Sequence, residues 1–266
     1  MGTALSDKRI VRLAHRHQRK KPNSIHPSAV ISPTARLGSN VCIMASVVVD
    51  EGACIGDGVT IYPHVYVGRD CVVGDGTILY PNVTLREAVK VGRRCRIHSG
   101  SVIGSDGFGF IPVANGRRLK IPHVGTVELG DDVVVGANAA IDRGTLEKTR
   151  VGSGVVIDAQ VQVGHNASIG DRTHIGTMSG ICGSTRIGRD VRLGHDVAVV
   201  PQIEIGDGAS AEDCSSITKN LPAGAHVGGM PALPTEEARR LRELECSLPE
   251  LFERLRALER KLADKP

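Results

Sequence analysis

Residues 151–170 read VGSGVVIDAQVQVGHNASIG, with an aliphatic residue at every sixth position. The series begins at Val151 and Ile157 and continues without a break to Ile205. An earlier stretch shows the same spacing over fourteen consecutive hexads, from Ile25 to Ile103. A period of six matches neither the turn of an α-helix nor a long strand, whereas short β segments joined by regular corners would point one aliphatic side chain inward per hexad. We therefore predict a stack of short strands around an aliphatic core.

Glycine often follows the inward aliphatic residue, as at Gly164 and Gly170. We expect this glycine to adopt the backbone conformation that a tight corner requires. The whole pattern resembles the hexapeptide-repeat left-handed parallel β-helix, an all-β, three-sided prism with three hexads in each coil. That resemblance implies the handedness, and it places residues eighteen apart above one another at a strand spacing of about 4.8 Å.

The composition predicts a narrow interior in a soluble protein. Of the 266 residues, 41% are hydrophobic but only 2% are aromatic. A broad core uses aromatic side chains to fill volume, so we expect a core of Val, Ile and Leu. No apolar run approaches the roughly 18 residues of a membrane span, and residues 1–13 are charged where a signal peptide would be apolar. We therefore expect a cytoplasmic protein without stable membrane insertion.

The seven cysteines are scattered along the chain and never form a Cys-x-x-Cys pair. Metal sites and disulfide frameworks need clustered or paired cysteines. We interpret the cysteines as small hydrophobic residues in a reducing compartment and predict no metal site.

Positive charge is concentrated in a basic N-terminal arm, residues 1–24. The first 21 residues contain seven Lys or Arg and one Asp, a net charge of +6, whereas the whole chain has a net charge of +4. Such an arm is consistent with a solvated tail, or with docking onto an acidic protein, anionic lipid or nucleic acid. We favour the solvated tail and expect no nucleic acid among the partners.

The hexads occupy residues 25–233 and are interrupted twice. A loop insertion, residues 106–126, contains two of the three phenylalanines, Phe108 and Phe110, together with a basic stretch. Insertions of this length are usually functional. A smaller bulge adds four residues between Ile141 and Val151.

Residues 234–266 are predicted to be helical. Thr235 is suited to cap a first helix and Ser247 to begin a second, with Pro249 dividing the two. Leucines spaced three and four apart favour either a coiled-coil seam or two helices that pack against the prism or against neighbouring subunits. The helices are also candidates to cap an open end of the prism. The leucines are Leu241, Leu244, Leu248, Leu251, Leu255, Leu258 and Leu262.

His165 is the strongest candidate for chemistry among the ten histidines. It stands two places after the inward Val163, so the period turns its side chain out of the prism, and Gly183 lies one coil above. A backbone N–H at Gly183 would be placed to hold a developing oxyanion while the imidazole accepts a proton. Asp158, seven residues before His165, is the candidate to orient the imidazole and stabilise its charged form.

Five stretches carry a family resemblance: GSDGFGF (104–110), KIPHVG (120–125), IDRGTL (141–146), IDAQVQVGHN (157–166) and GGMP (228–231). They resemble the UDP-3-O-acylglucosamine N-acyltransferases of lipid A synthesis. The resemblance implies a homotrimer with active sites in clefts between prisms. It implies transfer of a 3-hydroxyacyl chain from an acyl carrier protein thioester to the amine of the sugar.

The resemblance assigns His165 as the general base, Asp158 as its orienting carboxylate and Gly183 as the amide that contacts the acyl carbonyl. It implies no bound cofactor and no metal, because the phosphopantetheine thioester of the carrier protein, or an acyl-CoA, is a co-substrate. We further predict four residues that contact substrate: Asn166, Phe108, Phe110 and Gln202.

The sequence departs from the family pattern at two points. Hexads begin at Ile25, so we expect this chain to lack the N-terminal uridine-binding domain of the family. The family's second active-site histidine falls on Gln202, and glutamine forms hydrogen bonds but cannot shuttle a proton near neutral pH. His195 is a weak substitute, because the period places it on another face of the prism.

Three alternatives remain open. A CoA-dependent acetyl- or short-chain acyltransferase acting on another amine or hydroxyl would lack a long apolar groove. A paralogue that uses the prism only as a scaffold is favoured by Gln202 and opposed by His165 and Asp158. A zinc-dependent carbonic anhydrase is disfavoured because Gly170, five residues after His165, is no metal ligand.

Overall fold

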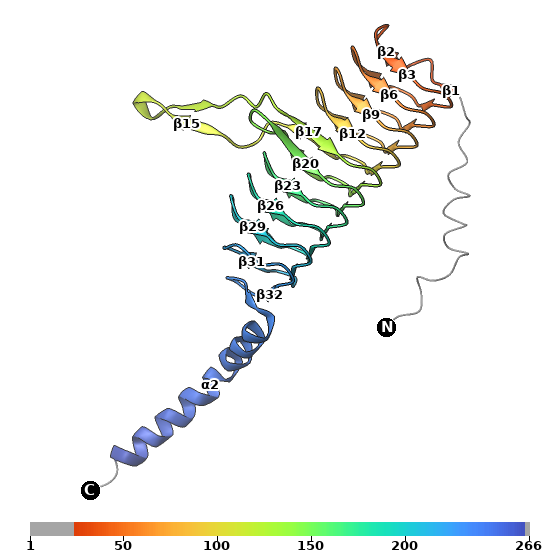
Figure 1. The fold of residues 1–266 in the computed structure, drawn as a ribbon. Coiled ribbons are helices and arrows are strands. Elements are labelled where there is room, and N and C mark those ends of the chain that lie inside the picture. Colours follow the sequence, from red (N-terminus) through yellow and green to blue (C-terminus); the bar gives the residue numbers. More distant parts are fainter. Residues whose placement is uncertain (1–23, 264–266) are drawn as a thin grey trace, which may run out of the picture.

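The protein is a long three-sided prism, with a hairpin projecting from its side and a helix from one end (Figure 1). A computed structural model describes residues 24–263, so residues 1–23 of the predicted basic arm lie outside the described residues. Very short strands build about 11 coils. This confirms the predicted fold class, a parallel β-helix of hexapeptide repeats with a C-terminal helical appendage.

The strands form three sheets, called here faces A, B and C, which are parallel throughout except for the last strand of face A. Face A consists of β1 (Ser24–Ile25), β4 (Cys42–Ile43), β7 (Thr60–Ile61), β10 (Ile78–Leu79), β13 (Arg96–Ile97), β18 (Val134–Val135), β21 (Val156–Ile157), β24 (His174–Ile175), β27 (Arg192–Leu193), β30 (Ser210–Ala211), β32 (His226–Gly228) and β33 (Leu233–Pro234). Face B consists of β2 (Val30–Ile31), β5 (Val48–Val49), β8 (Tyr66–Val67), β11 (Thr84–Leu85), β14 (Val102–Ser105), β19 (Ala140–Asp142), β22 (Gln162–Val163), β25 (Gly180–Ile181), β28 (Ala198–Val199) and β31 (Ser216–Ile217). Face C consists of β3 (Arg36–Leu37), β6 (Cys54–Ile55), β9 (Val72–Val73), β12 (Lys90–Val91), β17 (Thr126–Leu129), β20 (Lys148–Val151), β23 (Ser168–Ile169), β26 (Arg186–Ile187) and β29 (Glu204–Ile205).

Strands that are neighbours on one face pair eighteen residues apart over most of the prism, as the sequence period predicts. The register step rises to 38 residues where Lys90 pairs with Glu128, because the chain makes its large insertion there. It rises to 22 where Thr126 pairs with Lys148, which confirms the four-residue bulge. Backbone N–H groups of the strands donate to carbonyl oxygens of the coil above, and several corner N–H groups donate to the coil below, so neighbouring coils satisfy each other's backbone groups.

The inward aliphatic residues form the core. Each of them is at most 4% exposed from Ile43 to Ile103 and again from Leu129 to Ile205. Only the first coil departs from this, and Ile25 is 50% exposed. The predicted core of Val, Ile and Leu is therefore confirmed, and it runs the length of the prism.

Glycine has a different role from the one we expected. The backbone adopts positive φ at the third residue after the inward aliphatic residue, and that residue is often polar, as Asn166 (φ 59°) and Gln202 (φ 62°) are. The glycine that directly follows the aliphatic residue instead allows the coil above to come close. A Cβ on Gly164 would lie 2.7 Å from the backbone nitrogen of Gly183. Close packing between coils, rather than a left-handed corner, explains this glycine.

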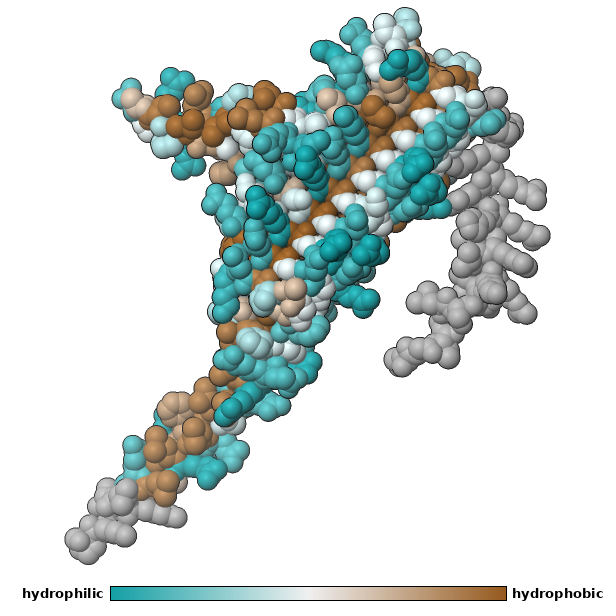
Figure 2. Space-filling model, in the orientation of Figure 1, coloured by the Kyte–Doolittle hydropathy of each residue, from teal (hydrophilic) through white to brown (hydrophobic). Residues whose placement is uncertain are grey.

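The insertion at residues 106–126 folds into the projecting hairpin (Figure 1). Its antiparallel strands are β15 (Phe110–Pro112) and β16 (Arg118–Lys120), joined through the 3-10 turn η1 (Ala114–Gly116). Figure 2 shows a largely hydrophobic surface along the hairpin, where Ile111 and Leu119 are exposed. Arg143, in the four-residue bulge, joins two coils next to the point where the insertion begins: its guanidinium donates to the carbonyl oxygens of Gly104 (2.9 Å) and Glu87 (2.7 Å).

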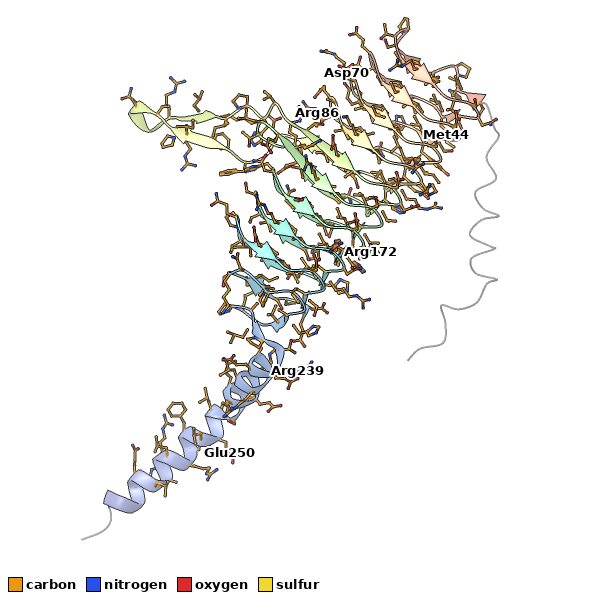
Figure 3. All side chains as sticks on the ribbon, in the orientation of Figure 1. Met44, Asp70, Arg86, Arg172, Arg239 and Glu250 are labelled. Carbon is orange, nitrogen blue, oxygen red and sulfur yellow. The ribbon has the colours of Figure 1, made fainter. Side chains whose placement is uncertain are left out.

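A single helix, α2 (Thr235–Ala263), follows the last coil. The prediction of two helices divided at Pro249 is therefore wrong: proline removes one backbone hydrogen bond, but the Leu, Glu and Arg residues on both sides are strong helix formers and the helix continues. Arg239 joins the start of the helix to Glu212 of the prism at 2.9 Å (Figure 3). Beyond this contact a stripe of apolar side chains is exposed: Leu241, Leu244, Leu248, Leu251, Phe252, Leu255 and Leu258. Among the described residues, no helix is both long and apolar enough to cross a membrane.

Candidate active site

An open pocket of about 390 Å³ lies at the corner between faces B and C, beside the base of the hairpin. It spans the coils that contain β19, β22, β25 and β28, and its floor is mainly glycine and aliphatic. The lining residues are Phe108, Asp142, Gln162, Gly164, His165, Gly180, Ile181, Cys182, Gly183, Ser184, Pro201 and Gln202. The pocket thus gathers His165, Gly183, Phe108 and Gln202, four of the predicted site residues.

His165 follows β22 and is half-buried. Its Nδ1 lies 3.1 Å from the Asn166 amide nitrogen and 3.5 Å from the Thr145 hydroxyl. The Asn166 amide is itself oriented, because its Oδ1 accepts a hydrogen bond from the Thr145 backbone N–H (2.9 Å). Asn166 therefore supports the imidazole.

The pKa of His165 lies below its ordinary value. The largest cause is burial, which disfavours the charged ring, and the neighbouring His123 adds like-charge repulsion. The carboxylate of Asp142 acts in the opposite direction. The net effect keeps the ring neutral, which is the form that can accept a proton.

Gly183 presents a backbone N–H with no hydrogen-bond partner among the described residues. At equivalent corners the N–H donates to an aspartate one coil above, as from Ser39 to Asp57 (2.6 Å) and from His195 to Asp213 (2.8 Å). The residue one coil above Gly183 is Pro201, whose side chain has no acceptor. The Gly183 N–H is therefore available to a ligand in the pocket.

Asp142 is a pocket carboxylate that sequence reasoning did not single out. It ends β19, one coil below Gly164, and is only 8% exposed. Its carboxylate accepts hydrogen bonds from the Ser105 hydroxyl (2.8 Å) and the Gln162 amide (2.9 Å). Burial is the main cause that raises its pKa, against these two hydrogen bonds. The register step at this bulge is 22 residues, so counting in steps of eighteen along the sequence does not place Asp142 beside Gly164.

The structure does not bring Asp158 to His165. Asp158 follows β21 at the corner between faces A and B, and its carboxylate accepts a hydrogen bond from the Ala159 N–H (2.7 Å). The two residues are seven apart in sequence, which is about a third of a coil, so they occupy different corners of the prism. Within one chain, Asp158 therefore cannot orient His165, and Asn166 and Thr145 contact the ring instead.

The other predicted residues divide between the pocket and its surroundings. Phe108 lines the pocket although it is 79% exposed, and it packs edge-to-face on Phe110 with ring centroids 5.2 Å apart. Phe110 itself is not among the lining residues.

His195 lies at the corner between faces A and B, away from the pocket, as expected. In the described part of the chain, no three His, Cys, Asp or Glu side chains are grouped to hold a metal ion.

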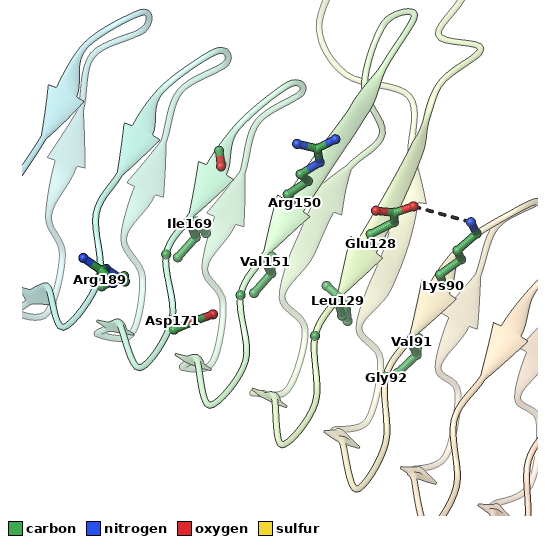
Figure 4. Close-up of a pocket in the computed structure, with 14 residues that line it drawn as sticks. Lys90, Val91, Gly92, Glu128, Leu129, Arg150, Val151, Ile169, Asp171 and Arg189 are labelled. Carbon is green, nitrogen blue, oxygen red and sulfur yellow. Dashed lines mark ion pairs between the residues drawn. The ribbon is translucent and has the colours of Figure 1, made fainter. Parts of the chain in front are cut away.

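A second hollow, of about 580 Å³, lies along face C (Figure 4). Its floor is formed by aliphatic residues followed by glycine, such as Val91 and Gly92. Charged pairs line its rim, including Lys90 with Glu128 at 3.5 Å. Its lining contains neither histidine nor cysteine, so we assign the chemistry to the pocket beside His165.

The chain shares sequence with hexapeptide transferases. Residues 34–69, 70–105 and 148–183 match the family described as "Bacterial transferase hexapeptide (six repeats)", and residues 124–143 match "Hexapeptide repeat of succinyl-transferase". A UDP-3-O-acylglucosamine N-acyltransferase from Bordetella pertussis is 47% identical over 90% of this chain and 67% of its own length. The protein of the same name from Coxiella burnetii is 42% identical over 92% of this chain and 72% of its own length.

Solved structures share the fold at low sequence identity. A UDP-N-acetylglucosamine acyltransferase from Arabidopsis superposes with a TM-score of 0.73 at 20% identity, covering 82% of this chain and 77% of the other. One from Campylobacter jejuni superposes with a TM-score of 0.63 at 19% identity, covering 82% and 81%. These likenesses concern the β-helix alone. The sequence identity to the Bordetella and Coxiella proteins, in contrast, extends over most of the chain. The chain therefore belongs to the UDP-3-O-acylglucosamine N-acyltransferase family.

Proposed function

We propose that the protein transfers a 3-hydroxyacyl chain from an acyl carrier protein thioester to the amine of a UDP-3-O-acylglucosamine-like amino sugar. The names of the Bordetella and Coxiella relatives support an amino-sugar acceptor. The observation that carries the proposal is the pairing of His165 with the free N–H of Gly183 at one pocket. A thioester is already activated, so the reaction needs a base for the amine and a donor for the oxyanion.

In this mechanism the acceptor amine attacks the thioester carbonyl carbon while His165 Nε2 takes a proton from the nitrogen. The carbonyl oxygen gains negative charge and is held by the Gly183 N–H. The C–S bond then breaks, and the proton on His165 passes to the leaving sulfur, so the products are an amide and a thiol. Gly183 contributes its N–H without a side chain, which leaves the space above the His165 ring open.

The base role selects one tautomer of His165. When Nδ1 accepts a hydrogen bond from the Asn166 amide, the ring proton is on Nε2 and this nitrogen cannot accept another. When Nδ1 carries the proton and donates it toward the Thr145 hydroxyl, the Nε2 lone pair is free for the amine. The Thr145 hydroxyl is therefore the group that supports the base-competent ring, and Asn166 supports the resting one.

We further propose that the protein acts in the cytoplasm as a homotrimer with sites between prisms. The exposed leucine stripe of α2 supports self-association, because an apolar stripe spaced by three and four residues normally faces another helix. The pocket is open beside the exposed Phe108, which leaves room for a second prism or for a long acyl chain. Residues 1–24 are basic and would suit an acidic carrier protein.

Acyl transfer by the purified protein tests the proposal. The donors are a panel of acyl carrier protein and coenzyme A thioesters, and the acceptor is UDP-3-O-acylglucosamine. His165→Ala should lower kcat by about 10²–10⁴. His195→Ala is the matched control, because this exposed histidine occupies an equivalent corner position outside the pocket and its loss should leave kcat unchanged.

Each outcome is informative. Turnover with carrier protein donors that His165→Ala abolishes would support both donor and base. Turnover only with short coenzyme A thioesters would replace the donor in the proposal by CoA. No turnover with any donor from a folded protein would overturn the acceptor, and light scattering that gives a monomer would overturn the site between subunits.

A further inference from the structure

His123 packs against the ring of His165. It is only 5% exposed and lies in the segment between β16 and β17, which returns from the hairpin to the prism. The two rings meet edge to face, with centroids 5.2 Å apart and planes at 68°. This is a favoured geometry for two aromatic rings, so His123 limits the rotation of the His165 ring.

The nitrogens of His123 are in unequal environments. Nδ1 lies 3.1 Å from the Ile121 carbonyl oxygen, and a carbonyl only accepts, so Nδ1 carries the hydrogen. The Nε2 of the neutral ring therefore has a lone pair, and it is buried without any hydrogen-bond partner in residues 24–263. Buried polar atoms are normally paired, so an unpaired one calls for an explanation.

Glycines of the hairpin base allow this contact. A Cβ on Gly107 would lie 2.9 Å from His165 Cβ and 3.0 Å from His123 Nε2, so the same glycine packs against both histidines. A Cβ on Gly109 would lie 3.2 Å from His123 Cε1. The backbone of the insertion is thus a shared wall, and the unpaired Nε2 faces this wall.

We propose that His123 is a positioning residue for His165: its ring, carried by the hairpin, packs edge to face on the ring of the base and holds it in place. This inference rests on the proposed role of His165 as general base. Two imidazoles this close act as one coupled system, in which the second proton is harder to add than the first. His123 would thereby keep the base available as the pH falls.

The other charged groups around the pair are accounted for. Asp142 faces His165 from β19 and favours its charged form. Asp106 lies near His123 but is paired with Lys120 at 2.8 Å. Arg143 is directed toward Glu87 and the Gly104 carbonyl. Besides Asp142, His123 is therefore the described titratable side chain that acts directly on His165.

NMR titration of the His165 ring tests the proposal in the free, full-length protein. His123→Gln and His123→Phe both remove the second ionisable ring, and Phe keeps the ring packing. We expect the His165 titration to move up by about half to one pH unit in both variants. His195→Phe is the control and should leave the titration unchanged.

Kinetics supply the second readout. The acid limb of kcat/KM should move up with the NMR titration, and kcat should fall about three- to tenfold in His123→Gln while KM stays constant, because His123 does not line the pocket. A His165 titration unchanged in both variants would overturn the proposal and leave His123 a packing residue. If the parent protein shows no acyl transfer, the proposed function fails while the NMR titration still tests the histidine pair.

Discussion

His165 occupies the space that a side chain at position 183 would need: a Cβ built on Gly183 would lie 2.7 Å from His165 Nε2 and 3.0 Å from Cε1. The base and the oxyanion donor are thus fitted to each other across one step of the coil. The pairing of β22 with β25 fixes this step, because Val163 lies in register with Ile181.

Gly183→Ala should therefore abolish activity without unfolding the protein. Gly183 does not have positive φ, so alanine is compatible with the backbone, but its methyl group must displace the imidazole. We expect kcat to fall by about 10²-fold or more, as for other losses of a positioned catalytic group. Ser39→Ala is the matched control, since Ser39 holds the equivalent corner position outside the pocket and its side chain is exposed. Equal activity of the two variants would contradict the close packing of His165 against Gly183.

Asp142→Asn should separate activity from stability. The pKa of Asp142 is raised, chiefly by burial. The folded protein therefore holds this proton more tightly than the unfolded chain. The resulting stabilisation is full below the unfolded-state pKa and is lost as the pH rises through the folded-state pKa. At neutral pH the buried charge is therefore a cost, and Asn should leave Tm equal or higher. We expect kcat to fall about 10- to 100-fold, because Asp142 favours the charged form of His165 that the reaction produces.

Asp158→Asn is the comparison for this experiment. Asp158 does not line the pocket of its own chain, so its substitution should leave kcat within about threefold of the parent. A loss as large as that of Asp142→Asn would mean that Asp158 reaches the site of a neighbouring chain. A clear fall in Tm for Asp142→Asn would contradict the assignment of Asp142 as a destabilising charge.

Asn166→Asp should shift the pH dependence upward. Burial and His123 lower the pKa of His165, so activity should persist to a pH below the ordinary histidine value of about 6.5 and be lost as the pH falls further. A carboxylate at 166 would accept from Nδ1–H and favour the charged ring, which should raise the acid limb of kcat/KM by about half to one pH unit. Aspartate also tolerates the positive φ of this position (59°).

The matched control is Asn138→Asp, which occupies the same hexad position at the corner between faces A and B and has a φ of 56°. Its acid limb should coincide with that of the parent. A downward shift in Asn166→Asp would show that Asn166 does not act on the ring nitrogen.

The sequence period was sufficient to predict the part of the site that obeys it. Val163 and Ile181 are eighteen residues apart, so the outward positions after them, including His165 and Gly183, could be placed on one corner by counting. Asp158 lies at the next corner of the same chain, because seven residues span about a third of a coil, so counting along one chain does not place it beside His165.

The rest of the site depends on the two interruptions of the repeat. Asp142 lies 22 residues before Gly164 because the bulge lengthens this coil, so counting by eighteen misses it. His123 reaches His165 only because the hairpin leaves the prism and returns, and no period describes that path. Long-range contacts made by an insertion follow from its packing, which local spacing does not encode.

Ile157→Ala tests the energetics of the repeat itself. Ile157 is fully buried on face A, between Val135 of the coil below and Ile175 of the coil above. Removing its side chain leaves a cavity, which should cost about 2–5 kcal/mol and lower Tm by several degrees in thermal unfolding. Val156→Ala on the outward side of the same strand is the control and should cost less than about 1 kcal/mol. Because each coil contacts only its neighbours, the cavity should loosen the coils around β21 first, and amide hydrogen exchange should rise there before it rises at either end of the prism. Uniform exchange along the prism would instead mean that the coils unfold as one cooperative unit.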